Sequence, residues 1–121
     1  MYKLMIVDDS NIIRSKIRRS HDDQKFSLVA TASNGKEAVE MYKNNEPDVI
    51  TMDLTMPEMD GLECIEKLMS INPNVAILVV SALSDKATGI EALELGARGF
   101  LLKPFTEEQL SEALEELTRH L

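Results

Sequence analysis

The stretch at residues 48–61 constrains this chain most. It opens with a run rich in Val, Ile and Thr, which is typical of a buried strand, and Asp53 stands where that strand is expected to end. An ionised carboxylate is rarely left in a core, because its desolvation is costly unless a cation or hydrogen bonds compensate. Residues 56–61 then supply the Pro, Asp and Gly of a turn before a helix. Asp53 is therefore expected at a strand-to-loop edge, where open α/β sheets bind their ligands.

Hydrophobic periodicity predicts five strands that alternate with five helices. The expected strands are residues 3–7, 26–32, 48–52, 75–80 and 99–102. The expected helices begin after residues 8–10, at Asn34, after Gly61, at Ser84 and Asp85, and at Thr106, with capping boxes that pair Asn34 with Glu37 and Thr106 with Gln109. Short connections between alternating elements predict an α/β fold, a doubly wound parallel sheet with helices on both faces. Residues 1–121 are expected to form a single domain.

The helix expected from residues 84–85 contains a glycine. Its core face is predicted to be Ala87, Ile90 and Leu93 or Leu95, which recur at helical spacing. Gly89 falls inside this helix, where a glycine costs about 1 kcal/mol relative to alanine. We therefore expect this helix to be the least rigid of the five.

Composition and charge exclude several classes of function. No segment approaches the roughly 20 apolar residues of a membrane span, and no signal peptide precedes the first strand, so a cytoplasmic protein without a membrane partner is expected. The lone cysteine, Cys64, forms no internal disulfide, which agrees with a reducing compartment. The net charge of −8 argues against direct binding of nucleic acid. The basic residues between Arg14 and Arg19 are expected to complement the dipole of the first helix and to face water.

Polar residues stand at the carboxyl ends of four expected strands, and parallel strands bring these ends to one edge of the sheet. They are Asp8 and Asp9, Asp53, Ser81 and Lys103. Three carboxylates at one edge repel one another, since a like-charge pair about 4 Å apart costs about 4 kcal/mol at an effective dielectric of about 20. One lysine offsets part of this repulsion. Mg²⁺ prefers such hard oxygen ligands, and the backbone carbonyl of Thr55 could complete the ligand set.

The same residue types are those needed to accept a phosphoryl group. A metal ion and an ammonium group neutralise the oxygens of the transferring group, while a carboxylate attacks and forms an acyl phosphate. Such a transfer depends mostly on positioning and charge stabilisation. Capping of the following helix is the alternative explanation for Asp8 and Asp9, but the coincidence of all five polar residues at one edge favours a site.

Several motifs resemble those of a known family. They are Val7-Asp8-Asp9-Ser10, Met52-Asp53 with residues 56–61, Val80-Ser81-Ala82, and residues 96–105, which read GARGFLLKPF. In these motifs the chain resembles the receiver domain of response regulators, and it is most similar to the stand-alone, CheY-like regulators of two-component signalling. The resemblance covers essentially all 121 residues. It implies the flavodoxin-like strand order 2-1-3-4-5 and a cis peptide bond between Lys103 and Pro104.

The resemblance also implies a role for each residue at the edge. Asp53 would take a phosphoryl group from the phosphohistidine of a sensor histidine kinase, Ser81 would bond a phosphoryl oxygen, and Lys103 would pair with the phosphate. The implied cofactor is Mg²⁺, for which Mn²⁺ can substitute, and its implied ligands are Asp8, Asp9, Asp53 and the backbone carbonyl of Thr55. The implied switch residues are Ser81 and Phe100, with Phe100 in place of the tyrosine that is frequent at this position.

A signalling function follows from this resemblance. Phosphorylation would change the face formed by the fourth helix, the fifth strand and the fifth helix, and so its affinity for an output protein, with chemotaxis or motility as the expected pathway. The chain would be a monomer or a weak phosphorylation-dependent dimer. It would catalyse only its own phosphorylation and dephosphorylation, so it is not expected to be an enzyme.

Two alternatives stay open at the level of sequence. One is a docking module that keeps the receiver fold but works without phosphorylation. The other is a Mg²⁺-dependent phosphatase with Asp53 as its nucleophile, although that class commonly carries a second acid two residues on, where this chain has Thr55. The presence of all five site residues favours the phosphorylated switch, because an unused acidic cluster destabilises a fold.

Overall fold

The computed structural model describes residues 1–56, 59–82, 86–119 and 121, and for residue 86 its backbone alone. The turn expected at residues 57–58 and the helix start expected at residues 84–85 lie outside the described residues. The strands are β1 (Tyr2–Val7), β2 (Phe26–Ala32), β3 (Val49–Asp53), β4 (Ala76–Ala82) and β5 (Gly99–Lys103). The helices are α1 (Asn11–Ser20), α2 (Gly35–Asn45), α3 (Gly61–Ile71), α4 (Lys86–Glu94) and α5 (Glu107–Thr118). None of the helices in these described parts has the length and apolar character that crossing a membrane requires.

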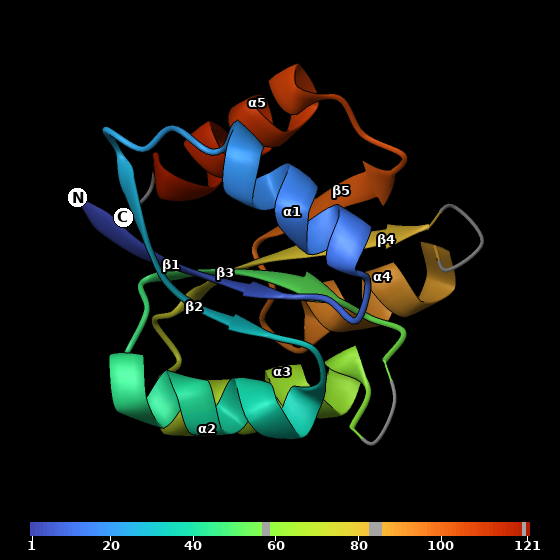
Figure 1. The fold of residues 1–121 in the computed structure, drawn as a ribbon. Helices are drawn as coiled ribbons and strands as arrows, with labels where there is room; N and C mark the ends of the chain where they lie inside the picture. The colour runs from blue at the N-terminus through green and yellow to red at the C-terminus, as the bar shows by residue number, and fades with distance from the viewer. Residues whose placement is uncertain (57–58, 83–85, 120) are drawn as a thin grey trace.

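All five strands are parallel and form one sheet in the order β2-β1-β3-β4-β5. Two layers of helices enclose the sheet, with α1 and α5 on one face and α2, α3 and α4 on the other (Figure 1). The predicted doubly wound sheet with strand order 2-1-3-4-5 is therefore confirmed. Because every strand runs in the same direction, all the carboxyl ends lie at one edge.

Alternate residues of the central strands pack into two separate cores. In β1, Met5 and Val7 pack on the face covered by α2, α3 and α4. Leu4 and Ile6 pack on the other face, beneath α1 and α5. Burial of each of these side chains contributes about 1.5–3 kcal/mol. Since β3 is buried along its whole length, both cores hold it firmly, and with it the acidic residue at its end.

Polar side chains begin the helices close to the predicted positions. Thr106 and Gln109 form the predicted capping box, in which each side chain accepts a hydrogen bond from the backbone N–H of the other residue. Asn34 Oδ1 accepts a hydrogen bond of 2.8 Å from the Glu37 N–H. The Glu37 carboxylate, however, accepts one from the Ser33 hydroxyl. The box predicted for Asn34 is therefore only half formed, because its glutamate has another partner.

Helix α4 turns a different face to the core from the one predicted. Its buried residues are Gly89 and Ala92. The predicted core residues Ala87, Ile90 and Leu93 are exposed, the last two by 53% and 42% of their surface. The prediction was wrong because an apolar stripe at helical spacing is the same in sequence whether it packs inward or faces outward.

The ring of Phe100 accounts for the orientation of α4. An ideal Cβ built on Gly89 would lie 1.9 Å from Phe100 Cε2, so the ring occupies the space that any larger side chain would need. Small residues on this side let the helix approach β5 closely. Leu95, the remaining predicted core residue, is half-buried and packs against the same core as Phe100. The glycine that weakens the helix in isolation is therefore required by its packing.

Replacing Gly89 with alanine is expected to lower the free energy of unfolding by up to about 2 kcal/mol. The new methyl group collides with the Phe100 ring, and this cost exceeds the gain of about 1 kcal/mol from the better helix propensity of alanine. With Phe100→Ala in the background the collision is gone, so the same substitution should stabilise the protein instead. Urea unfolding of the four proteins measures this cycle. Equal destabilisation in both backgrounds would contradict the packing assigned to the ring.

Candidate functional site

The predicted site residues stand at the carboxyl edge of the sheet, the edge to which the strand arrowheads point in Figure 1. Asp8 follows β1 directly, Asp53 is the last residue of β3, and Lys103 is the last residue of β5. Ser81 lies one residue beyond Val80, which is the register partner of Asp53 in β4. The parallel register thus places residues from four strand ends at one edge, and contacts join the side chains from β1, β3 and β5.

A lysine and three carboxylates meet at this edge. Lys103 Nζ lies 3.1 Å from Asp8 Oδ2 and 3.4 Å from Asp53 Oδ1. One carboxylate oxygen from each of Asp8, Asp9 and Asp53 lies within 4.8 Å of the other two. Asp8 and Asp53 are buried, whereas Asp9 is exposed. The predicted meeting of three acids and one cation is therefore present, and it is open to water on the side of Asp9.

The backbone after β3 is tied closely to Asp53. The Thr55 N–H donates a hydrogen bond of 3.3 Å to Asp53 Oδ1, and the Gly61 N–H donates one of 3.0 Å to the Leu54 carbonyl. A Cβ on Gly61 would lie 2.5 Å from the Asp53 carbonyl oxygen, so glycine is what lets α3 begin this close to the end of β3. Thr55 is exposed, and its role as a carbonyl ligand stays a prediction.

Two cations of α1 support the loops around the site. Arg14 Nη1 donates a hydrogen bond to the backbone carbonyl of Asp8, which restrains the loop after β1. Lys16 Nζ donates to the backbone carbonyl of Phe105 and lies 4.5 Å from the centroid of its ring, so it restrains the segment after β5. The prediction that these two cations face water was therefore wrong, whereas the two arginines at the end of α1 are exposed as predicted. Lys16 and its partner are 89 residues apart, so no local pattern signals the contact.

Burial raises the pKa of Asp53 to about 6, and the charge of Asp8 adds to the effect. Lys103 and the Thr55 N–H act in the opposite direction. Burial by itself lowers the pKa of Lys103, but the carboxylates of Asp8 and Asp53 more than compensate and raise it. The edge therefore carries three acids against one ammonium, an imbalance that a further cation would relieve.

The acidic cluster fits a hard divalent cation. Asp8 Oδ2 is buried and accepts no hydrogen bond, although it lies beside the charge of Lys103. The other oxygen, Asp8 Oδ1, accepts a hydrogen bond of 2.9 Å from the Ser10 N–H, so Oδ2 is the one available to a metal ion. Carboxylate oxygens are the ligands that Mg²⁺ and Mn²⁺ prefer. Asp8, Asp9 and Asp53 could hold such an ion.

Without a divalent cation, Asp53→Asn is expected to be more stable than the wild type at neutral pH, by on the order of 1–2 kcal/mol after allowance for screening by water. The pKa of Asp53 is about 6 in the folded state and ordinarily 3.8, so the folded state binds more protons between these values. Wild-type stability therefore falls as the pH rises through this window. The difference between the two proteins should shrink as the pH is lowered to 3.8. Urea unfolding in EDTA measures this difference in the free energy of unfolding. A difference that does not change with pH would argue against the raised pKa.

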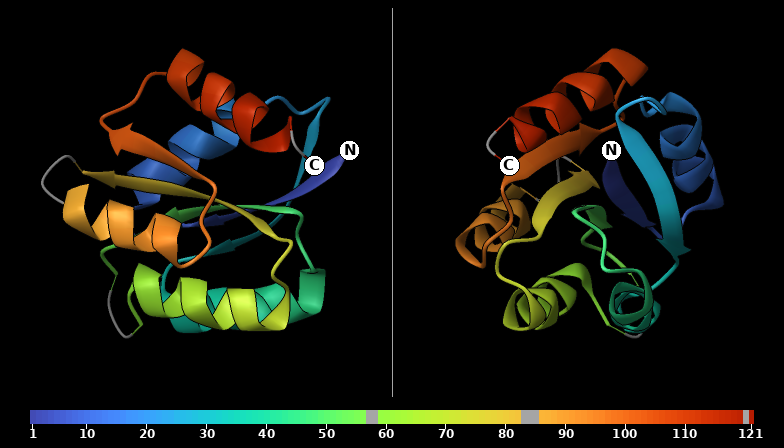
Figure 2. Two further views of the ribbon diagram at one scale, coloured as in Figure 1. Left: turned by 180° about the vertical axis from the view of Figure 1, so that it is seen from behind. Right: turned by 90° about the vertical axis from the view of Figure 1, so that its left-hand side faces the viewer.

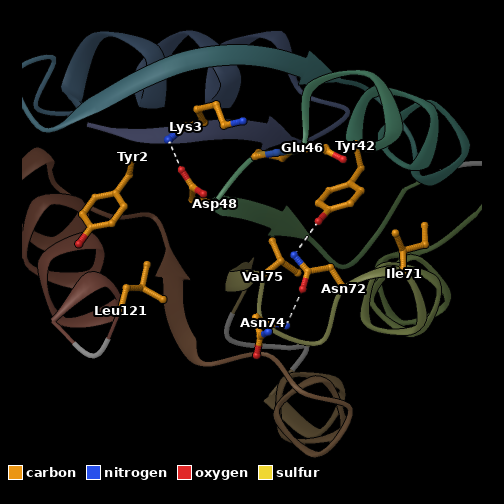
Figure 3. A pocket seen from close by; sticks show the side chains of 11 residues that line it. Tyr2, Lys3, Tyr42, Glu46, Asp48, Ile71, Asn72, Asn74, Val75 and Leu121 are labelled. Carbon is orange, nitrogen blue, oxygen red and sulfur yellow. Dashed lines mark hydrogen bonds between the residues drawn. The ribbon is translucent and has the colours of Figure 1, made fainter.

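A cavity of about 610 Å³ opens near the amino ends of β1 and β3, away from the acidic cluster (Figure 3). Several of its polar groups bond to one another. The Lys3 N–H donates to Asp48 Oδ2 at 2.8 Å, and Asn72 Nδ2 donates to the Tyr42 hydroxyl at 2.9 Å. Because these groups are already paired, we assign the functional site to the carboxyl edge and not to this cavity.

The parallel sheet, the acidic cluster with its lysine, and the cis peptide bond between Lys103 and Pro104 together define the receiver class of signalling domains. The cis bond is the one that the sequence resemblance implies. Residues 4–115 match the response regulator receiver domain family, so the chain belongs to that family.

Several relatives are chemotaxis proteins named CheY. The chain is 40% identical over 119 residues to the chemotaxis protein CheY of Listeria monocytogenes, a match that covers 98% of this chain and 100% of that protein. The REC domain of AraT, a response regulator from Geobacillus stearothermophilus, matches with a TM-score of 0.93 and 33% identity over 98% of this chain and 94% of that one. CheY of Borrelia burgdorferi, solved in a complex with CheX, BeF₃ and Mg²⁺, matches with a TM-score of 0.90 and 30% identity over 96% and 88%. CheY-like receiver domains are signalling proteins and not classical enzymes.

Proposed function

We propose that this protein is a response regulator whose receiver domain, residues 1–121, accepts a phosphoryl group on Asp53 from the phosphohistidine of a sensor histidine kinase. The observation that carries the proposal is the position of the Asp53 carboxylate at a strand end, 3.4 Å from the Lys103 ammonium and beside two further carboxylates. The chemotaxis protein CheY among the relatives supports chemotaxis signalling as its setting. The proposed location is the cytoplasm.

In the proposed reaction, an ionised oxygen of Asp53 attacks the phosphorus atom, and the P–N bond to the histidine breaks with its electron pair leaving on the imidazole. Lys103 pairs with one phosphoryl oxygen, and the Ser81 hydroxyl donates a hydrogen bond to another. Mg²⁺, or Mn²⁺ in its place, supplies further positive charge when held by the three carboxylates and the Thr55 carbonyl. The presence of BeF₃ and Mg²⁺ in the complex of the Borrelia relative supports a site of this kind.

The proposed switch residues are Ser81 and Phe100. Ser81 is buried at the end of β4, and Phe100 is half-buried in β5 with its ring against Gly89 of α4. A phosphoryl group on Asp53 would draw Ser81 and Lys103 toward itself, and both lie on strands that support α4 and α5. The α4-β5-α5 face would then change its affinity for an output protein. The phosphorylated chain is expected to be a monomer or a weak dimer.

The mass of the intact protein after incubation with acetyl phosphate tests the proposal. With Mg²⁺ the mass should rise by one phosphoryl group, and with EDTA it should not, because the uncompensated acids repel the phosphate. Borohydride reduction of the acyl phosphate, followed by peptide mapping, should place the label on Asp53. Folded protein that gains no mass under either condition would favour a docking module that works without phosphorylation, and turnover of a phosphomonoester would favour a phosphatase.

A further inference from the structure

The peptide bond between Asp8 and Asp9 joins two of the three acids at the sheet edge. Its carbonyl oxygen accepts a hydrogen bond from Arg14 Nη1. The same guanidinium group donates through Nη2 to the side-chain oxygen of Asn11, the first residue of α1. A planar guanidinium presents its donors in a rigid fork, so two bonds fix its orientation as well as its position. Asn11 therefore aims Arg14 at this peptide bond.

The orientation of this peptide bond decides how the two acids lie relative to each other. Because the peptide unit is planar, turning the Asp8 carbonyl also turns the N–H of Asp9. The backbone on either side is already held. The Asp8 N–H donates a hydrogen bond of 3.0 Å to the Ala32 carbonyl, and the Ser10 N–H donates one of 2.9 Å to Asp8 Oδ1. Arg14 supplies the restraint between these two points.

The helix that carries Arg14 is a firm support. Ile17 of α1 is 1% exposed and packs in the same core as Leu110 and Leu114 of α5. Figure 2 shows α1 and α5 on one face of the sheet, with α2 and α3 on the other. Arg14 itself is half-buried. A side chain on a rigid, packed element holds a neighbouring group more precisely than a side chain on a loop does.

We propose that Arg14 is a positioning residue for the metal site and that, through the Asp8 carbonyl, it fixes the carboxylates of Asp8 and Asp9 relative to each other. The inference rests on the proposed function, in which these acids hold Mg²⁺. Removing a group that orients metal ligands from behind typically weakens metal binding by about 10–100-fold. Asp53 and Lys103 lie on other strands, so Arg14 should affect metal binding more than the phosphoryl transfer itself.

The sign of the effect separates this role from simple electrostatics. Arg14 is a cation beside the acidic cluster, and its removal makes the site more negative. If charge alone mattered, Arg14→Met would bind Mg²⁺ more tightly than the wild type does. Loss of the hydrogen bond to the Asp8 carbonyl predicts the opposite, because the two acids must then be ordered when the ion binds.

Isothermal titration calorimetry with Mg²⁺ alone measures the affinity. Arg14→Met should weaken Mg²⁺ binding by about 10-fold or more, and Arg14→Lys, which can still donate one hydrogen bond, should weaken it less. The matched control is Arg18→Met, which removes the same charge from an exposed position one turn further along α1. Its affinity should stay within about two-fold of the wild-type value, because water and salt screen an exposed charge. Asn11→Ala should weaken binding in the wild type but add little to Arg14→Met, since the group that Asn11 orients is then absent.

Urea unfolding in EDTA shows whether each variant is folded, and the intact mass after incubation with acetyl phosphate reports uptake. At saturating Mg²⁺, Arg14→Met should take up the phosphoryl group at nearly the wild-type rate, and a rate that stays as low as the affinity would overturn the inference. So would an affinity of Arg14→Met equal to or above that of the wild type, an equal loss in Arg18→Met, or a wild type that binds no Mg²⁺. If Arg14→Met does not fold, unchanged affinity in both Arg14→Lys and Asn11→Ala would overturn it. Failure of the wild-type mass to rise would instead refute the proposed function, and the Mg²⁺ titrations would still decide the role of Arg14.

Discussion

Asp53→Asn is expected to reduce phosphoryl uptake from acetyl phosphate by at least about 100-fold, to the limit of detection in the intact mass. The carboxylate is the proposed nucleophile, and an amide in its place has neither the negative charge nor the free oxygen needed to form an acyl phosphate. The variant should fold, because the substitution removes a charge whose buried position raises its pKa to about 6. If Asp53→Asn loses phosphoryl uptake but stays as stable as the wild type, the loss is therefore due to the missing nucleophile and not to unfolding.

Asp60→Asn is the matched control for this result. Asp60 is exposed and caps α3 by accepting a hydrogen bond of 2.9 Å from the Glu63 N–H. Asparagine caps helices about as well as aspartate does, so the fold should be unaffected. Both variants lose one carboxylate, but only Asp53→Asn should lose the mass gain. Full uptake in Asp53→Asn, or an equal loss in both, would show that Asp53 is not the acceptor.

Lys103→Met is expected to have the second largest effect. The ammonium lies between two buried carboxylates, 3.1 Å from Asp8 and 3.4 Å from Asp53, and methionine keeps the length of the side chain without the charge. The unpaired acids should lower the free energy of unfolding in EDTA by about 2–3 kcal/mol, less than for a fully enclosed pair because the lysine side chain is 22% exposed. Phosphoryl uptake should slow by about 100-fold, since the ammonium no longer stabilises the transferring group.

Mg²⁺ separates the two effects of this substitution. A divalent cation at the acidic cluster should restore much of the lost stability, because it offsets the repulsion between the carboxylates. Mg²⁺ should not restore the rate of phosphoryl uptake. In the proposed reaction the Lys103 ammonium neutralises one phosphoryl oxygen, and the metal ion does not replace the ammonium there. Lys16→Met is the control, since Lys16 is a half-buried lysine bonded outside the cluster, to the Phe105 carbonyl. Urea unfolding and mass spectrometry measure both quantities. If Lys103→Met is as stable as the wild type in EDTA, this result would contradict the ion pairs of Lys103 with Asp8 and Asp53.

The order and type of the elements are predictable from the sequence because hydrophobic periodicity is a local property. The predicted strands agree with the observed bounds to within two residues. The acidic site is predictable for a related reason. Once the strands are parallel, residues at their carboxyl ends must share an edge. Asp8, Asp53 and Lys103 meet there because β1 and β3 are neighbours in the sheet and β5 lies two strands from β3.

The orientation of α4 is not predictable in this way. Ile90 and Leu93 recur at a spacing typical of a buried stripe, yet both are exposed, and Gly89 is buried instead. The outcome depends on the Phe100 ring, which approaches from a different element and leaves room only for a residue without a side chain. A contact of this kind is set by packing between elements and leaves no periodic signal in the helix itself.

The chemical groups at the sheet edge follow from the sequence, because the residues at the carboxyl ends of the predicted parallel strands are three acids, a hydroxyl and a lysine. How those groups behave depends on the packing of the folded chain. The pKa of Asp53 depends on how completely its neighbours exclude water, and the support from Lys16 depends on a contact with Phe105, 89 residues away in the sequence. Whether the apolar side chains of α4 belong to a core or to a binding surface was likewise settled by packing, since burial is a property of the assembled fold.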